Sequence, residues 1–295
     1  MLNPFLIKLN EVNPQEILFS IHGFTNANQK AAAERVMIEK LPGSIADYKR
    51  KFDRVLKHLE YGDTFLTNLT VKTEIKLGCT LSDIFHQSKA KYKLLFKNQF
   101  LVFSPETFIQ IKAGKIYAYP MKGTIDASIV NAKEKILADR KELAEHVTIV
   151  DLIRNDLSQV ASQVVVSRFR YIEEVRSWEK KLLQVSSEIC GHLDQDYANH
   201  LGDILLKLLP AGSVSGAPKP KTLEIINEVE EEARGYYTGV FGYFNGSDVD
   251  CGVMIRFIEN KDGRYFYRSG GGITTQSDVE SEYRETIDKV YVPVA

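Results

Sequence analysis

Cysteine is scarce in this sequence. Cys79, Cys190 and Cys251 are scattered along 295 residues and do not have the spacing of metal ligands. An odd number leaves one thiol unpaired in any disulfide scheme, and this usage is typical of a reducing compartment. We therefore expect free thiols and a cytoplasmic protein.

An excess of charge of one sign and a long apolar run are also missing. With 38 basic and 39 acidic residues the net charge is −1, which argues against a surface for nucleic acid or an anionic membrane. The N-terminus lacks a signal-peptide pattern, and no apolar stretch reaches the length of a membrane span. We expect neither nucleic acid nor a membrane as a partner.

Hydrophobic residues, in contrast, make up 44% of the chain, which is ample for a large core. Strand-like segments occur in hairpins, as at 92–96 and 100–103, whereas helical segments form separate blocks. Ser44 begins one helix, which Gly62 ends. This order predicts an α+β fold with antiparallel sheets. No repeat or low-complexity linker appears, so we expect one domain over residues 1–295.

The last quarter of the chain carries three strand-like segments and a final helix. We predict a meander of 237–244, 249–258 and 264–269, followed by a helix over 279–290. Arg256 lies in the second of these segments, between Ile255 and Phe257. An arginine on such an apolar strand either binds a carboxylate bidentately or is paired in the core, and the pattern alone does not decide between them.

A glycine-rich loop at 209–219 precedes another helical segment, 219–232. Gly212 and Gly216 stand four apart among small hydroxyl residues, and Pro218 suits a first helical turn. Glycines allow close approach to a ligand, and free N–H groups at a helix start attract an anion. The loop is a candidate anion cradle or a structural turn, and its spacing is not that of a Walker loop.

Two glutamate pairs occur at helical spacing. Glu142 and Glu145 are three apart, as are Glu282 and Glu285, so each pair lies on one helix face. They are either solvated acidic faces or, if the two helices converge, an oxygen-rich site that suits Mg²⁺. The nearby segment 151–156 carries two further acids, and we interpret it as an ion-paired helix end.

These features accompany several other motifs in a fixed order. They are Ser104-Pro105-Glu106, Pro120-Met121-Lys122-Gly123-Thr124, Asp151-Leu152-Ile153-Arg154-Asn155-Asp156, the glycine loop, Arg234-Gly235-Tyr236-Tyr237-Thr238-Gly239, Gly270-Gly271-Gly272-Ile273 and Glu280-Ser281-Glu282-Tyr283-Arg284-Glu285-Thr286. In this order they resemble the chorismate-utilising enzymes, a family that includes anthranilate, isochorismate, salicylate and aminodeoxychorismate synthases. The resemblance covers residues 61–289.

The resemblance implies a fold of two packed antiparallel β-sheets flanked by helices, with the active site between the sheets. Residues 61–289 would form the family core of a chorismate-binding catalytic domain. Most relatives are longer at the N-terminus, where anthranilate synthases carry a tryptophan pocket. Residues 1–43 therefore suggest a shortened N-terminal region that does not respond to tryptophan.

The resemblance also assigns roles to the candidate site residues. It implies that Glu145 and Glu285 hold Mg²⁺, supported by Glu142 and Glu282. Residues that match substrate-binding positions are Thr124, Ser213, Gly216, Tyr237, Arg256, Gly270 and Gly272. Glu106 matches the general acid that protonates the departing C4 hydroxyl of chorismate.

Lys122 indicates the branch of the family. Anthranilate and isochorismate synthases usually carry alanine there, whereas aminodeoxychorismate synthases carry lysine. Only about one lysine in a few thousand is neutral at pH 7, so a nucleophilic Lys122 needs a lowered pKa, which we expect from burial beside Mg²⁺. The resemblance then implies that Lys122 adds at C2 and that ammonia displaces it by adding at C4.

Two departures bear on this branch. Leu66 replaces a usually polar residue, at the position where isochorismate and salicylate synthases place a water-activating lysine. Gln184 stands where anthranilate synthases have histidine. Both weigh against those alternative activities.

We therefore expect aminodeoxychorismate synthase component I, a transferase on the p-aminobenzoate and folate route. Because no Cys/His glutaminase signature is present, ammonia would come from a separate glutamine amidotransferase. The alternatives are anthranilate synthase component I and a non-catalytic subunit with the same fold.

Overall fold

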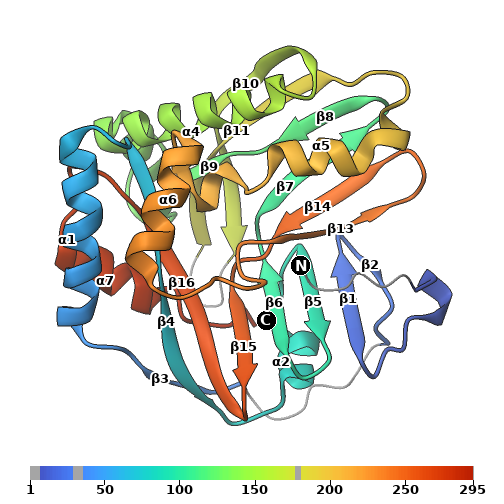
Figure 1. The fold of residues 1–295 in the computed structure, drawn as a ribbon, viewed down its shortest axis with the longest axis horizontal. Coiled ribbons are helices and arrows are strands. Elements are labelled where there is room, and N and C mark those ends of the chain that lie inside the picture. Colours follow the sequence, from blue (N-terminus) through green and yellow to red (C-terminus); the bar gives the residue numbers. More distant parts are fainter. Residues whose placement is uncertain (1–6, 29–35, 177–180, 295) are drawn as a thin grey trace.

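The computed structural model describes residues 7–28, 36–176 and 181–294. Two antiparallel β-sheets pack together, with helices on the outside of the molecule (Figure 1). The predicted α+β class and the two-sheet architecture are confirmed. In the described ranges no helix is both long and apolar enough to cross a membrane.

The first sheet is built around two long strands. β4 and β16 pair from Ile75↔Tyr265 to Thr67↔Ile273, which brings the triple-glycine motif beside the start of β4. Its described strands are β1 (Ile17–Ile21), β2 (Phe24–Thr25), β3 (Ile38–Leu41), β4 (Leu66–Leu77), β5 (Tyr92–Phe96), β6 (Phe100–Ser104), β12 (Gly216–Ala217), β15 (Phe257–Lys261) and β16 (Arg264–Ile273).

The second sheet has the order β10-β11-β8-β7-β14-β13, and β9 pairs with β11. Its two longest strands, β10 and β11, pair with each other. Its strands are β7 (Thr107–Lys112), β8 (Lys115–Ala118), β9 (Met121–Asp126), β10 (Ser162–Arg176), β11 (Lys181–His192), β13 (Val240–Phe244) and β14 (Val249–Val253).

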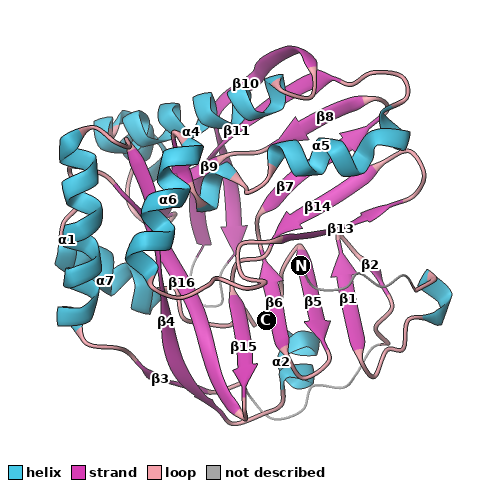
Figure 2. Ribbon diagram, in the orientation of Figure 1, coloured by secondary structure: helices cyan, strands magenta, loops and turns pink. Residues whose placement is uncertain are grey.

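The helices cover the two sheets separately (Figure 2). α1, α6 and α7 pack on β4 and β16, and α4 packs on β9, β10 and β11. The bounds are α1 (Ile45–Tyr61), α2 (Leu81–Gln87), α3 (Ala132–Ala138), α4 (Arg140–Ser158), α5 (Leu201–Leu208), α6 (Lys219–Glu230) and α7 (Val279–Asp288), with short 3₁₀ turns η1 (Leu9–Glu11), η2 (Tyr197–His200) and η3 (Gly212–Val214).

Local sequence signals set the ends of α1. The Ser44 hydroxyl accepts a hydrogen bond from the N–H of Asp47, and Gly62 ends the helix in the left-handed conformation. The buried stripe of this helix includes Tyr48, Phe52 and Val55, which pack against Leu69 of β4 and Ile225 of α6. The predicted helix is confirmed.

The predicted meander is wrong in its second strand. The run 249–258 is broken: β14 ends at Val253 in the second sheet, and β15 starts at Phe257 in the first. Arg256 lies in this break with φ of 52°, a left-handed conformation that few non-glycine residues adopt. The chain crosses between the sheets at this point, so Arg256 projects from the crossing and not from a strand.

Candidate active site

A cavity of about 190 Å³ lies where both sheets, α4, α7 and the glycine loop meet. β9 supplies Lys122, β16 supplies Gly270, and α7 supplies Glu285. The wall brings together ten of the residues predicted from the sequence: Glu106, Lys122, Glu145, Ser213, Gly216, Tyr237, Arg256, Gly270, Gly272 and Glu285. Segments far apart in the chain thus meet at one hollow.

The glycine loop reaches this cavity because its backbone lies against β4. Gly216 has φ of 140°, and a Cβ atom there would lie 1.9 Å from the carbonyl oxygen of Leu66, so only glycine fits. Pro218 is the N-cap of α6, and Pro220 occupies the first helical turn. The predicted start of this helix at Lys219 is confirmed, but Pro218 is the N-cap and does not lie in the first turn.

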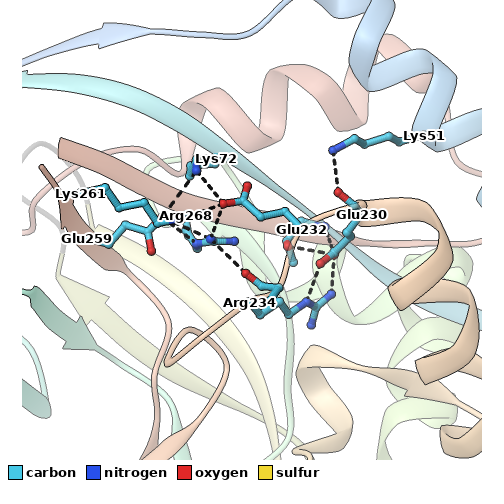
Figure 3. Close-up of polar contacts among 10 residues, drawn as sticks. Lys51, Lys72, Glu230, Glu232, Arg234, Glu259, Lys261 and Arg268 are labelled. Atoms are coloured by element: carbon cyan, nitrogen blue, oxygen red, sulfur yellow. Dashed lines mark hydrogen bonds and ion pairs between the residues drawn. The ribbon is translucent and has the colours of Figure 1, made fainter. Parts of the chain in front are cut away.

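An ion pair behind the loop fixes its position (Figure 3). The Arg234 guanidinium donates to the carbonyl oxygens of Val214, at 2.6 Å, and Asn68, at 2.8 Å. Its Nε donates to the buried Glu230 carboxylate at 2.8 Å. One arginine therefore joins the loop to the first sheet, and its charge is balanced by the last residue of α6.

Glu106 lies at the turn between β6 and β7, next to the loop. The hydroxyl of Ser213 donates a hydrogen bond to its carboxyl group. Burial raises the pKa of Glu106, and this outweighs the opposing effects of Ser213, Lys289 and Arg256. A carboxyl group that keeps its proton in this way can act as a general acid.

Lys122 is ion-paired within the cavity. Its Nζ lies 2.7 Å from Oε2 of Glu145. Burial alone would lower the pKa of Lys122, but the charges of Glu145, Glu142 and Glu285 hold it above the ordinary value. We expected a lowered pKa for Lys122 from the sequence, but the neighbouring groups of the protein raise it. Lys122 can be neutral only when this negative charge is engaged elsewhere.

Glu142 and Glu282 lie directly behind the cavity wall. A Cβ atom on Gly123 would be 2.8 Å from Oε2 of Glu142, and one on Gly271 would be 3.2 Å from Oε2 of Glu282. Both carboxylates approach the backbone where a side chain is missing. The two glutamate pairs therefore converge on the cavity from α4 and α7, but only Glu145 and Glu285 form its wall.

This donor set fits Mg²⁺. No group of three or more His, Cys, Asp or Glu side chains in the described ranges converges closely enough to form a metal cluster by itself. Mg²⁺ takes few protein carboxylates and keeps positions for water and an anionic substrate. The carboxylates of Glu145 and Glu285 already attract the ammonium groups of Lys122 and Lys289, at 2.7 and 2.6 Å. They could hold such an ion.

The far side of the cavity is positively charged and tightly held. The Arg256 guanidinium donates to the carbonyl oxygen of Lys289 at 2.8 Å and lies 4.7 Å from the ring centre of Tyr291. Tyr237 is buried beside it in an aromatic contact with Phe257. A guanidinium fixed in this way can bind a carboxylate with little loss of side-chain freedom.

Sequence reasoning missed two cations of the wall, Lys289 and Arg268. Lys289 donates to the carbonyl oxygen of Gly270 at 2.7 Å and pairs with Glu285, four residues before it. Arg268 is buried and pairs with Glu232 and Glu259 behind the wall (Figure 3). The helical spacing of Lys289 from Glu285 could have found it.

The structure does not bring Thr124 to the cavity. Thr124 is exposed and lies opposite Gln184 of β11. The β9–β11 register shifts beside Lys122, and Gly123 has φ of 85°. Such a bulge interrupts the alternation of side chains between the two faces of a strand. Lys122 therefore lines the cavity, and Thr124, two residues later, does not. Gln184 is likewise absent from the cavity wall.

Comparisons with known proteins agree on the family. Residues 14–295 match the chorismate binding enzyme family. An uncharacterized PabA-like protein of Pasteurella multocida is 47% identical over 293 residues, covering 99% of this chain and 90% of that protein. Anthranilate synthase component I of Streptococcus pneumoniae has a similar structure, with a TM-score of 0.74 and 26% identity over 89% of this chain and 60% of that one.

More distant relatives carry two different names. Anthranilate synthase component 1 of Archaeoglobus fulgidus is 32% identical, with 92% of this chain and 69% of that protein covered. Aminodeoxychorismate synthase component 1 of Bacillus subtilis is 30% identical, with 88% and 59% covered. These identities do not separate the two activities, but the shared fold and the family match agree: the chain belongs to the chorismate binding enzymes.

Proposed function

We propose that this protein aminates chorismate at C4, with Mg²⁺, to give 4-amino-4-deoxychorismate. The observation that carries the proposal is Lys122 on the wall of the cavity that also holds Glu106. A lysine amine and a protonated carboxyl group are the nucleophile and the acid that a stepwise displacement needs. This is the reaction of aminodeoxychorismate synthase component I, on the route to p-aminobenzoate and folate.

Substrate binding would use the two charged sides of the cavity. Chorismate carries two carboxylates, and Arg256 and Lys289 offer donors for one of them near Tyr237. Glu145 and Glu285 would hold Mg²⁺, with Glu142 and Glu282 in support. The ion would supply positive charge for the second carboxylate and engage Glu145, whose charge otherwise keeps Lys122 protonated.

The displacement would then proceed in two steps. The neutral amine of Lys122 adds at C2, the two conjugated ring double bonds shift, and the C4–O bond breaks. Glu106 gives its proton to the departing oxygen, which leaves as water. Ammonia adds at C4, the two double bonds shift back, and Lys122 is expelled from C2 as a neutral amine. The sum is chorismate and ammonia to 4-amino-4-deoxychorismate and water.

Apolar residues beside Lys122 oppose competing hydration. Leu66, Met121 and Ile149 line the cavity, and a Cβ atom on Gly272 would lie 2.9 Å from Leu66 and 4.0 Å from the Lys122 amine. A leucine in this place offers no base for a water molecule. This supports amination over the formation of isochorismate or salicylate.

Anthranilate synthase component I is the second candidate, because relatives of that name match as well as the aminodeoxychorismate synthases do. It would place ammonia at C2. Lys122 disfavours this outcome, since its amine would itself occupy C2. In either case we propose that a separate glutamine amidotransferase supplies the ammonia.

The test is an assay of the purified chain with chorismate, MgCl₂ and an ammonium salt. We expect a product with the mass of an aminated chorismate and the amino group at C4, and none from Glu106→Gln. A product aminated at C2 would select the anthranilate synthase reaction. No consumption of chorismate would support a non-catalytic subunit.

A further inference from the structure

A second, smaller hollow adjoins the main cavity and has no part in the function so far. It has a volume of about 50 Å³ and lies under the second sheet, between β7, β8, α4 and the end of α5. We call it the inner chamber. One water molecule needs about 10–15 Å³ of cavity volume, so the chamber holds a few molecules of that size and cannot hold chorismate.

The wall of the inner chamber is mostly apolar. Ile109, Ala118, Leu157, Leu208 and Val253 line it, and each is at most 2% exposed. Such a surface disfavours a charged occupant, because an ion loses its hydration there without a partner. It can take a small neutral molecule.

The chamber and the main cavity share one partition. Glu106, Ser213 and Gly212 line both hollows, together with Met121 and Ile149. The hydrogen bond from Ser213 to Glu106 is part of this partition. A molecule in the chamber therefore contacts the carboxyl group of Glu106, whereas Lys122 and Glu145 line the main cavity and not the chamber.

A second carboxylate lies in the chamber wall. Asp156 of α4 is 7% exposed and pairs with Lys219 at 2.8 Å. The segment 151–156 was predicted to be an ion-paired helix end, and Asp156 fits this prediction. The otherwise apolar wall of the chamber therefore carries two acidic groups, those of Asp156 and Glu106. Each offers a carboxyl oxygen that can accept a hydrogen bond from a small neutral donor.

We propose that the inner chamber is the binding site for the second substrate, ammonia, and that it delivers ammonia to C4 beside Glu106. The inference rests on the proposed function and adds the place from which the nitrogen arrives. Delivery at Glu106 directs ammonia to the carbon that the hydroxyl has just left. Arrival beside Lys122 would instead favour C2.

The proton balance closes at Glu106. After Glu106 has given its proton to the leaving oxygen, it is a carboxylate at the border of the chamber. Neutral ammonia forms the C4–N bond as the bond from C2 to Lys122 breaks, and nitrogen then carries an extra proton. Glu106 takes this proton and is again the acid for the next turnover. No further reactant is needed.

The first test fills the chamber. Ala118→Val adds two carbon atoms to a buried wall residue of β8, and Ala132→Val adds the same atoms at a buried position of α3 that lines neither hollow. Binding of one non-hydrogen atom is worth at most about 1.5 kcal/mol, which is about tenfold in affinity. With ammonium chloride as nitrogen source, we expect Ala118→Val to raise KM for ammonium by up to about tenfold, with KM for chorismate unchanged and no change in Ala132→Val.

The second test enlarges the chamber, in case the filled variant does not fold. Ile109→Ala should let methylamine act as a nucleophile and give an N-methylated C4 product that the wild type does not form. Wild-type amination with an unchanged KM for ammonium in Ala118→Val, or with no use of methylamine by Ile109→Ala, would overturn the chamber as the ammonia site. Absence of amination in the wild type would instead overturn the proposed function.

Discussion

Replacing Lys122 by methionine removes an ammonium group from the cavity wall while keeping an unbranched side chain of similar length. If Lys122 is the covalent nucleophile, kcat for amination at C4 should fall on the order of a thousandfold or more, because one difficult displacement is no longer split into two. KM for chorismate should change little, since Arg256 and Lys289 remain in place on the other side of the cavity.

The same change should strengthen the binding of Mg²⁺. Lys122 lies 2.7 Å from Glu145 and its side chain is 34% exposed. At an effective dielectric constant of about 20, such a pair attracts by roughly 6 kcal/mol, but exposure and screening reduce measured values to about 1 kcal/mol or less. Removing this competitor should tighten Mg²⁺ binding by about fivefold.

The assay combines product analysis with calorimetric titration of Mg²⁺ into the protein without chorismate. Lys112→Met is the matched control, because Lys112 lies on β7 and pairs with Gln110, outside the main cavity. Some amination at C2 by direct attack of ammonia is compatible with the reasoning. Unchanged turnover to the C4 product would refute a covalent role for Lys122, and unchanged Mg²⁺ affinity would refute the metal position beside Glu145.

Five further substitutions test other parts of the structure. Glu145→Gln and Glu285→Gln should each abolish turnover at low Mg²⁺ while the melting temperature is kept, because each removes a charged oxygen ligand; full activity in either would contradict the site. The raised pKa of Glu106 predicts that kcat falls as pH rises through it. The folded protein binds this proton more tightly than the unfolded chain, so the stabilisation is present at low pH and lost as pH rises. Glu106→Gln should therefore raise the melting temperature at neutral pH but not in acid, and an equal shift at both would count against the assignment. Gly252→Ala would place a Cβ atom 2.4 Å from the ring of the buried Tyr92 and should cost up to about 3 kcal/mol of stability. Gly202 lies in α5, and a Cβ atom there would meet no atom within 4 Å, so Gly202→Ala should gain up to about 1 kcal/mol of stability. A melting temperature of Gly252→Ala equal to or above that of Gly202→Ala would contradict both expectations.

The sequence predicts those parts of the fold whose signals are local. Ser44 caps α1 and the left-handed Gly62 ends it, as expected. The crossing at Arg256 was missed, because residues 249–258 are continuously strand-like. Nothing in their periodicity says that their two halves hydrogen-bond to different sheets.

The candidate site shows the same division. Helical spacing put each glutamate pair on one helix face, and the family resemblance selected Glu145 and Glu285, which line the cavity. Only the family resemblance assigned Thr124 to substrate binding, and it does not line the cavity; the bulge in β9 beside it has no signal in the sequence. Arg268 could not be found from a pattern, because its position depends on ion pairs with Glu232, which follows α6, and with Glu259 of β15.

Lys289 links the two charged sides of the cavity through different atoms. Its carbonyl oxygen holds Arg256, and its ammonium group holds Glu285 and the carbonyl oxygen of Gly270. Substitutions on the acidic side and on the basic side therefore share a partner, and their effects on binding should not add. In directed evolution, variants selected separately for each half of the site should fail when combined more often than variants at sites that share no partner. The last turn of α7 would then appear in a library as a centre of epistasis.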